Sequence, residues 1–173
     1  MILQIRPMTM ADIAAVAALE AEIFSDAWSG RLYQETLESG RYDCQVLELL
    51  PEKQEKEPLA EQQAEKNTHP VFENTVSSVL AGYFCGQVIL DEAEVHRIAV
   101  CADLRGKGYG QLLLEDFLMR AEKQGVISVL LEVRAGNAPA IGLYVKNGFA
   151  RIGVRRGYYQ KPKEDALILQ KSF

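Results

Sequence analysis

Residues 98–111, IAVCADLRGKGYGQ, form the stretch of sequence that decides the fold. The apolar IAV at its start is typical of the end of a buried strand, and the leucines that follow the stretch begin an amphipathic helical pattern. Between them stands RGKGYG, whose glycines let backbone N–H groups point at an anion while the helix dipole adds to the attraction. The stretch predicts a strand–loop–helix unit for a phosphate-bearing ligand, with a plain tight turn as an equal alternative.

Two familiar phosphate-binding loops do not fit this segment. A Walker loop needs Ser or Thr after its Gly-Lys pair, whereas Gly108 follows Lys107 here. A dinucleotide fingerprint, G-x-G-x-x-G, needs a third glycine three residues after the second, but after Gly108 and Gly110 that position is Leu113. The pattern that remains is R-G-x-G-x-G, formed by Arg105, Gly106, Gly108 and Gly110.

The segments on either side of this unit predict an α/β fold. Alternating or continuous apolar runs indicate strands, and apolar residues three or four apart indicate helices. Strands are expected at residues 2–5, 42–50, 76–90, 95–100, 127–133, 149–155 and 166–169, and helices at residues 9–24, 31–37, 111–124 and 137–147. The run at 127–133 is apolar on both faces, as in a sheet covered on both sides. We expect a mixed central sheet of about seven strands with helices on both faces.

The composition indicates one folded domain over residues 1–173. Of the 173 residues, 48% are apolar and 25% are charged, which is typical of globular proteins. Residues 51–74 differ, because their mixed-charge run EKQEKEPLAEQQAEK has few large apolar side chains, and we expect a mobile surface insertion there. No run of about 18 apolar residues exists for a membrane span. No signal-peptide core follows the first residues, so a cytoplasmic protein is expected.

Charge is divided unevenly along the chain. The formal net charge of −5 argues against direct, sequence-independent binding of nucleic acid. Residues 1–101 hold 17 acidic and 7 basic side chains, whereas residues 102–173 hold 7 acidic and 12 basic ones. The basic part suits a polyanionic ligand. We expect the acidic part, including Glu20, Glu22 and Glu35, to attract a cationic amine.

The cysteines and histidines predict no metal site. Cys44, Cys85 and Cys101 are odd in number and lack C-x-x-C spacing, so neither a disulfide framework nor a zinc site is indicated. We expect them to be small, buried or half-buried residues. His69 and His96 are too few and too far apart to form a metal cluster.

Three further segments extend the pattern of the glycine loop. They are VHRIAV before the loop, LLEVRAGNAPAIGLYVKNGF after it, and RRGYYQKPKEDALIL near the C-terminus. Together with the loop they resemble the GNAT superfamily of N-acetyltransferases, in its ribosomal protein alanine N-acetyltransferase branch. The resemblance covers residues 78–173 strongly and residues 1–50, including FSDAWS, more loosely. It implies a GNAT fold and direct acetyl transfer from acetyl-CoA to the N-terminal amine of a protein, which could be a ribosomal protein.

The resemblance also implies a set of site residues. The backbone of Ile98, Ala99 and Val100 would hold the pantetheine arm and the thioester. Asn137 would form a hydrogen bond with the cofactor, Glu132 would accept the proton of the amine, and Tyr144 would donate a proton to the CoA sulfur. The pyrophosphate loop falls on Arg105, Gly106, Lys107, Gly108, Tyr109, Gly110 and Gln111.

Physical chemistry leaves alternatives for the two catalytic candidates. A carboxylate within an apolar strand needs a partner, and Arg134, two residues from Glu132 on the same face, offers one. Tyr144 has the spacing of a core aromatic residue, although a buried phenol can also protonate a departing thiolate. Two alternative functions therefore stay open. The nearest alternative is a GNAT enzyme that acetylates a lysine or a small-molecule amine, and the alternative from another class is a non-catalytic CoA-binding module.

The acceptor side is less defined. Tyr158 and Tyr159 either line an acceptor groove, as the resemblance implies, or close a hairpin, and the two interpretations are equal. Phe24 and Trp28 either flank the same groove or form a contact at a helix end. His96 and the neighbouring Arg97 are interpreted as surface or cross-strand residues rather than catalysts.

Overall fold

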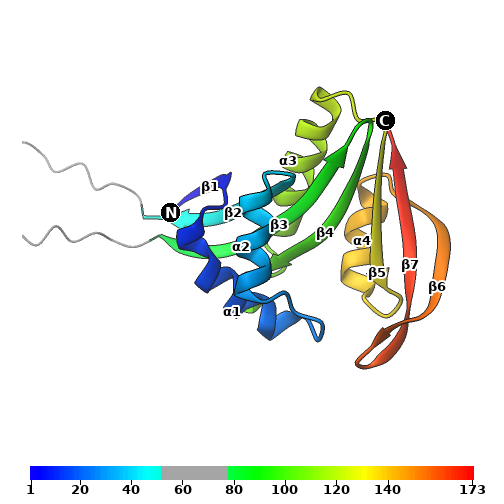
Figure 1. Cartoon of the computed structure of the whole chain (residues 1–173), viewed down its shortest axis with the longest axis horizontal. Helices are drawn as coiled ribbons and strands as arrows, with labels where there is room; N and C mark the ends of the chain where they lie inside the picture. Colours follow the sequence, from blue (N-terminus) through cyan, green and yellow to red (C-terminus); the bar gives the residue numbers. More distant parts are fainter. Residues whose placement is uncertain (52–77) are drawn as a thin grey trace, which may run out of the picture.

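The computed structural model of the chain describes residues 1–51 and 78–173, so the expected insertion at 51–74 lies, apart from Pro51, outside the described residues. The strands are β1 (Ile2–Pro7), β2 (Tyr42–Leu50), β3 (Val79–Ile89), β4 (Glu92–Val100), β5 (Ser128–Arg134), β6 (Ala150–Gln160) and β7 (Lys163–Ser172). The α-helices are α1 (Ile13–Ile23), α2 (Gly30–Ser39), α3 (Tyr109–Lys123) and α4 (Ala138–Lys146), with 3₁₀ turns at Met10–Asp12 and Ala102–Leu104. The predicted order of strands and helices is confirmed (Figure 1).

The strands form one seven-stranded sheet in the order β1-β2-β3-β4-β5-β7-β6. β4 and β5 are parallel, and the other neighbouring pairs are antiparallel. α1 and α2 cover one face, and α3 and α4 cover the other (Figure 1). The mixed sheet with helices on both faces is therefore confirmed, and each face has its own apolar core.

Local sequence signals account for the helices. The apolar face of α3 is buried, and it consists of Leu113, Leu114, Phe117, Leu118 and Ala121. α2 ends at Gly40, which has φ +62° in the left-handed region, where a glycine carries no Cβ penalty. Asn137 begins α4, because its side-chain oxygen accepts a hydrogen bond from the backbone N–H of Ala140 at 3.2 Å.

Three strand predictions differ from the structure. The β3–β4 hairpin turns at Leu90, which has φ +59°, and Asp91, and Glu92 already pairs with Ile89, so β4 begins at Glu92 rather than at the expected residue 95. β6 and β7 extend beyond the predicted 149–155 and 166–169, because a register shift in β6 lets pairing continue to Gln160. β5 is fully covered on one face only, since Glu132 and its neighbours on the opposite face are half-buried.

The cysteine prediction is partly wrong. Cys44 and Cys85 are buried, as expected, but they lie opposite each other in the β2–β3 register and are joined by a disulfide. Cys101 is free and half-buried. The register of two strands that are far apart in sequence decided this pairing, and cysteine spacing does not contain that register.

Candidate active site

The two parallel strands at the centre of the sheet separate before they end. β4 pairs with β5 only from Glu92 to Val95, opposite residues 128–131. Beyond that point residues 97–100 of β4 pair with β3 alone, and His96 is an extra residue at a register shift. Among the described residues, the edge of β4 at residues 97–100 that faces β5 has no strand partner. We call this region, between residues 96–100 and residues 132–134, the strand opening (Figure 1).

The glycine loop follows directly from the strand opening. Gly106 and Gly108 have φ +75° and +83°, and both have open space where a Cβ would stand. Gly108 precedes the first turn of α3. Because it is a glycine, it has no side chain that could cap the N–H groups of that turn. The Nε of Arg105 donates to the carbonyl of Val100 at 3.1 Å, which fixes the loop to the end of β4. Uncapped N–H groups at a helix start suit the phosphates of CoA.

Two predicted cofactor residues have a structural role. The Nε2 of Gln111 donates to the Oδ1 of Asn147 at 2.9 Å, which ties α3 to α4. Its side chain therefore points away from the loop, and any phosphate contact would come from its backbone. Asn137 uses its side-chain oxygen to cap α4. Lys107 is exposed beside the glycines.

Glu132 projects from β5 on the face that is shared with α1 and α2. Its carboxylate forms an ion pair with Arg155 of β6, with Nε and Oε1 2.7 Å apart, and 20% of its side chain is exposed. The Tyr158 hydroxyl also donates to Glu132, and this bond is the largest cause that raises the pKa of Tyr158. The structural partner expected for Glu132 is wrong, because Arg134 instead pairs with Glu164 at 3.2 Å.

Tyr144 lies on α4, on the opposite face of the sheet. Only 5% of it is exposed, and its ring centroid lies 5.7 Å from that of Phe149. Burial, with a smaller contribution from Tyr159, raises the pKa of Tyr144 above its ordinary value, so the phenol keeps its proton at neutral pH. Among the described residues its hydroxyl has no hydrogen bond within the fold. The two catalytic candidates thus approach the centre of the sheet from opposite sides.

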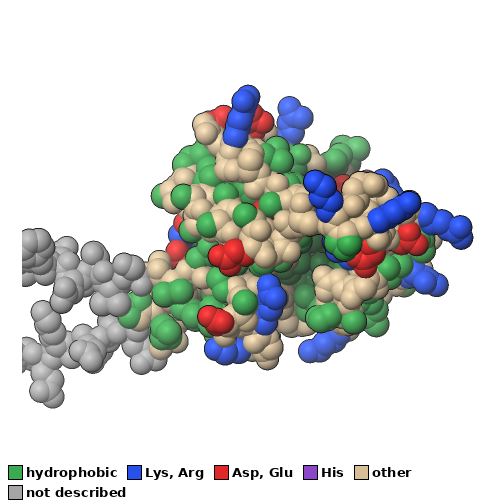
Figure 2. Space-filling model, turned by 90° about the horizontal axis from the view of Figure 1, so that it is seen from below, with side chains coloured by type: hydrophobic (Ala, Val, Ile, Leu, Met, Phe, Trp, Pro, Cys, Tyr) green, Lys and Arg blue, Asp and Glu red, His purple; other side chains and the backbone are tan. Residues whose placement is uncertain are grey.

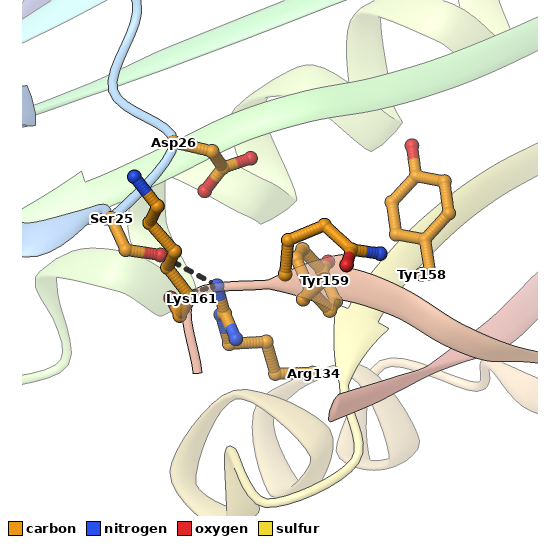
Figure 3. A pocket seen from close by; sticks show the side chains of 7 residues that line it. Ser25, Asp26, Arg134, Tyr158, Tyr159 and Lys161 are labelled. Atoms are coloured by element: carbon orange, nitrogen blue, oxygen red, sulfur yellow. Dashed lines mark hydrogen bonds between the residues drawn. The ribbon is translucent and has the colours of Figure 1, made fainter. Parts of the chain in front are cut away.

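A pocket of about 280 Å³ is lined in part by Tyr158, the tyrosine that contacts Glu132 (Figure 3). Glu132 itself is not one of the lining residues. Its lining comes from the segment between α1 and α2, from β5, and from the end of β6, namely Ser25, Asp26, Arg134, Tyr158, Tyr159, Gln160 and Lys161. Arg134 crosses it, donating to the Ser25 Oγ at 2.7 Å and lying 4.0 Å from the centre of the Tyr159 ring. We call it the acceptor pocket, after the role that we propose for it below.

The pocket decides between several sequence interpretations. Tyr158 and Tyr159 lie in β6 next to the hairpin and also line the pocket. Phe24 and Trp28 do not line it, although they belong to the segment that forms its wall. Ser25 and Asp26 were not identified as site residues, and the only signal for them was their place in FSDAWS.

The distribution of charge on the surface agrees with the predicted basic C-terminal part but not with the predicted role of the acidic N-terminal part. Seen from below, basic side chains spread over the right-hand part of the molecule, which contains α4 and strands β5–β7 (Figure 2). The acidic half differs, because Glu20 is fully buried and Glu35 pairs with Arg31 at 2.8 Å. The expectation that Glu20 attracts an amine at the surface is therefore wrong.

No cluster of three or more metal-ligating side chains occurs in residues 1–51 and 78–173. Within the same ranges, no helix has the length and apolar character required to cross a bilayer.

Known proteins resemble this chain over most of its length. The model of the Acetyltransferase (GNAT) family matches residues 19–149. The chain is 43% identical over 100 residues to the ribosomal protein bS18-alanine N-acetyltransferase of Escherichia coli strain K12. The aligned region covers 57% of this chain and 68% of that protein. A Bacillus subtilis relative, provisionally given the same name, is 31% identical over 167 residues, or 95% of this chain and 92% of that protein.

A solved structure agrees with these matches. The crystal structure of the ribosomal-protein-S18-alanine N-acetyltransferase from Escherichia coli superposes with a TM-score of 0.75 at 30% identity, covering 99% of this chain and 94% of that one. The expected GNAT fold is thereby confirmed. The chain belongs to the GNAT family of acetyltransferases and is an acetyl-CoA-dependent N-acetyltransferase.

Proposed function

We propose that the chain transfers acetyl from acetyl-CoA to the N-terminal α-amine of a protein, by direct attack within the strand opening. The observation that carries this proposal is the arrangement around the opening. Free backbone of β4 borders it on one side and Glu132 of β5 on the other. The glycine loop follows at the end of β4, and Tyr144 comes from the opposite face.

The cofactor half of the proposal uses mainly backbone groups. The backbone of Ile98, Ala99 and Val100 pairs with β3 on one side only, and the groups that face away from β3 are suited to hydrogen bonds with the amides of the pantetheine arm. The first N–H groups of α3 and the preceding loop would hold the diphosphate. Asn137 has an exposed amide nitrogen beside its capping oxygen, which leaves a donor for the cofactor.

Acetyl transfer requires one proton acceptor and one proton donor. Glu132 would take the proton of the amine, through a water molecule, as the nitrogen attacks the thioester carbonyl. Backbone N–H groups near Val100 would stabilise the charge on the carbonyl oxygen. As the carbon–sulfur bond breaks, the hydroxyl proton of Tyr144 would pass to the sulfur, because a thiol with a pKa of about 8.5 leaves poorly as an anion near neutral pH.

An α-amine is the better acceptor for this site. Its pKa is about 7.7–8.0, against about 10.4 for a lysine, so deprotonating the lysine at neutral pH costs roughly 3.5 kcal/mol more. A single carboxylate is a modest base and serves the α-amine more readily. The names of the relatives point the same way, since they are alanine N-acetyltransferases of a ribosomal protein. A ribosomal protein N-terminus, met in the cytoplasm, is the partner that we propose.

A peptide panel tests this function. The purified chain and acetyl-CoA are mixed with a peptide that begins with Ala and contains one internal lysine, and the acetylated position is mapped by mass spectrometry. We expect acetylation at the N-terminal amine alone. A matched peptide with a blocked N-terminus should remain unmodified. Acetylation confined to the lysine would support the lysine acetyltransferase instead, and CoA binding without turnover would support a non-catalytic module.

A further inference from the structure

A fully buried carboxylate lies beneath the wall of the acceptor pocket. Glu20 of α1 has no exposed surface. Its Oε2 accepts hydrogen bonds from the hydroxyls of Tyr33 and Tyr83. Its Oε1 accepts from the backbone N–H of Trp28 at 3.0 Å and from the Nε of Arg97 at 2.9 Å. Four donors from α2, β3, β4 and the segment after α1 therefore converge on one side chain, which satisfies a charge that would otherwise be costly to bury.

Arg97 connects this carboxylate to the segment at residues 24–29, which we call the acceptor loop. Its guanidinium carbon lies 5.1 Å from the centre of the Phe24 ring and 5.0 Å from the Trp28 ring. Both rings thus contact the cation, and only 16% of the Arg97 side chain is exposed. The aromatic residues at the two ends of the acceptor loop are held by the same arginine.

The same guanidinium extends to the pocket itself. The Nη2 of Arg97 donates to the backbone carbonyl of Asp26 at 3.2 Å and lies 3.4 Å from its carboxylate. Asp26 is one of the residues that line the acceptor pocket, opposite Tyr158 and Tyr159 (Figure 3). A single residue of β4 therefore fixes the wall of the pocket from behind.

The acceptor loop has few other polar anchors, although Phe24 and Trp28 also pack against the apolar core on this face. Among the described residues, its polar ties to elements outside α1 and α2 are those to Arg97 and the bond from Arg134 to Ser25 Oγ. Arg134 comes from β5, so the loop bridges the two strands that border the strand opening. A displacement of about 1 Å in such a support is enough to lower reactivity strongly.

We propose that Arg97, oriented by the buried Glu20, is a positioning residue for the acceptor. It holds Asp26 and the acceptor loop in the conformation that receives the N-terminal residue of the acceptor, and it has no contact with the cofactor. The proposal rests on the proposed function, and it assigns to Arg97 a role in binding the acceptor rather than acetyl-CoA.

Steady-state kinetics separate the two substrates. In Arg97→Gln, the KM for a peptide that begins with Ala should rise about tenfold, whereas the KM for acetyl-CoA should stay within about twofold of the parent value. Arg97→Lys keeps the charge but loses the planar fork, and it should restore part of the peptide KM. Arg31→Gln is the matched control, because Arg31 on α2 is 86% exposed and pairs only with Glu35. It should leave both constants unchanged.

Fluorescence provides a readout that does not depend on turnover. The chain has one tryptophan, Trp28, whose ring contacts Arg97. In Arg97→Gln the acrylamide quenching of Trp28 should increase about twofold, since the loop loses its support against solvent. Arg31→Gln should quench like the parent protein. CoA binding, measured by calorimetry, should remain the same in all three proteins.

These measurements distinguish the failure of the two proposals. If the parent chain does not acetylate peptides but Arg97→Gln exposes Trp28, the proposed function fails, and Arg97 remains a support of the acceptor loop with no peptide acceptor to position. Unchanged Trp28 quenching with an unchanged peptide KM would overturn the positioning role. A parallel rise of both KM values, with weaker CoA binding, would also overturn it, because it would indicate a general loss of structure.

Discussion

The proposed cofactor side and the proposed acceptor side of this enzyme are built in different ways. The cofactor side consists of the end of β4, the glycine loop and the first turn of α3, which are consecutive in the sequence. The acceptor side gathers Ser25 and Asp26, Arg134, and Tyr158 and Tyr159 from three distant segments. The first offers mainly backbone groups and the second mainly side chains. A local motif is therefore enough to bind a single cofactor, whereas the choice of acceptor depends on how distant segments pack.

Glu132→Gln should have the largest effect, because it removes the proposed base while leaving both sides in place. Turnover with a peptide that begins with Ala should fall by a factor of about 100 or more. Arg155, the partner of Glu132, is 58% exposed and stays hydrated, so the melting temperature should change little. Glu35→Gln on the surface of α2 is the control. If Glu132→Gln keeps more than half of the parent turnover, Glu132 is not the base.

Tyr144→Phe should have the next largest effect. Its hydroxyl has no hydrogen bond among the described residues, so the substitution should leave the fold intact. Since the raised pKa of Tyr144 keeps the proton available for the sulfur, its loss should slow turnover by about tenfold or more. Turnover and thermal unfolding are measured together. Parent-like turnover would exclude Tyr144 as the proton donor.

Gly108→Val tests the cofactor side alone. A valine at φ +83° adds strain of about 1–2 kcal/mol, and we expect the KM for acetyl-CoA to rise by roughly tenfold while the peptide KM is unchanged. Gly142→Ala on α4 is the control, because Gly142 has open space and an ordinary φ, and alanine favours the helix. An increase of the peptide KM in Gly108→Val would mean that the two sides are not separable.

Asp12→Asn should have the smallest effect, and the effect should depend on pH. Hydrogen bonds from Arg6 are the largest cause that lowers the pKa of Asp12 to about 2, against an ordinary 3.8. This carboxylate therefore stabilises the start of α1 above pH 4, and the contribution disappears as the pH falls through 2. Solvent screening limits the loss in Asp12→Asn to about 1 kcal/mol at pH 7. Urea unfolding at pH 7 and pH 2 measures it, and an equal difference at both values would contradict this account.

The elements that could be predicted are those that local sequence determines. β2 lies at the predicted 42–50, and the caps at Gly40 and Asn137 come from side-chain types and glycine conformation. The glycine loop was visible because its residues are contiguous. In each case the physical cause acts within a few residues of the signal.

The elements that could not be predicted depend on packing between distant segments. Glu20 was interpreted as a surface charge, but two of its partners, Tyr83 and Arg97, are 63 and 77 residues away. Arg155 replaced Arg134 as the partner of Glu132 because the order of the strands, with β7 next to β5, brings β6 near that face. Neither strand order nor register is encoded in a short stretch of sequence.

The most direct test of the central claim is a crystal structure with a CoA–peptide conjugate whose peptide begins with alanine. We expect the diphosphate to lie within hydrogen-bonding distance of the backbone at residues 106–110. The alanine nitrogen should lie in the strand opening near Glu132, and the peptide should contact Asp26 and Tyr159. A conjugate whose peptide lies outside the acceptor pocket, or whose diphosphate lies away from the glycine loop, would contradict the account.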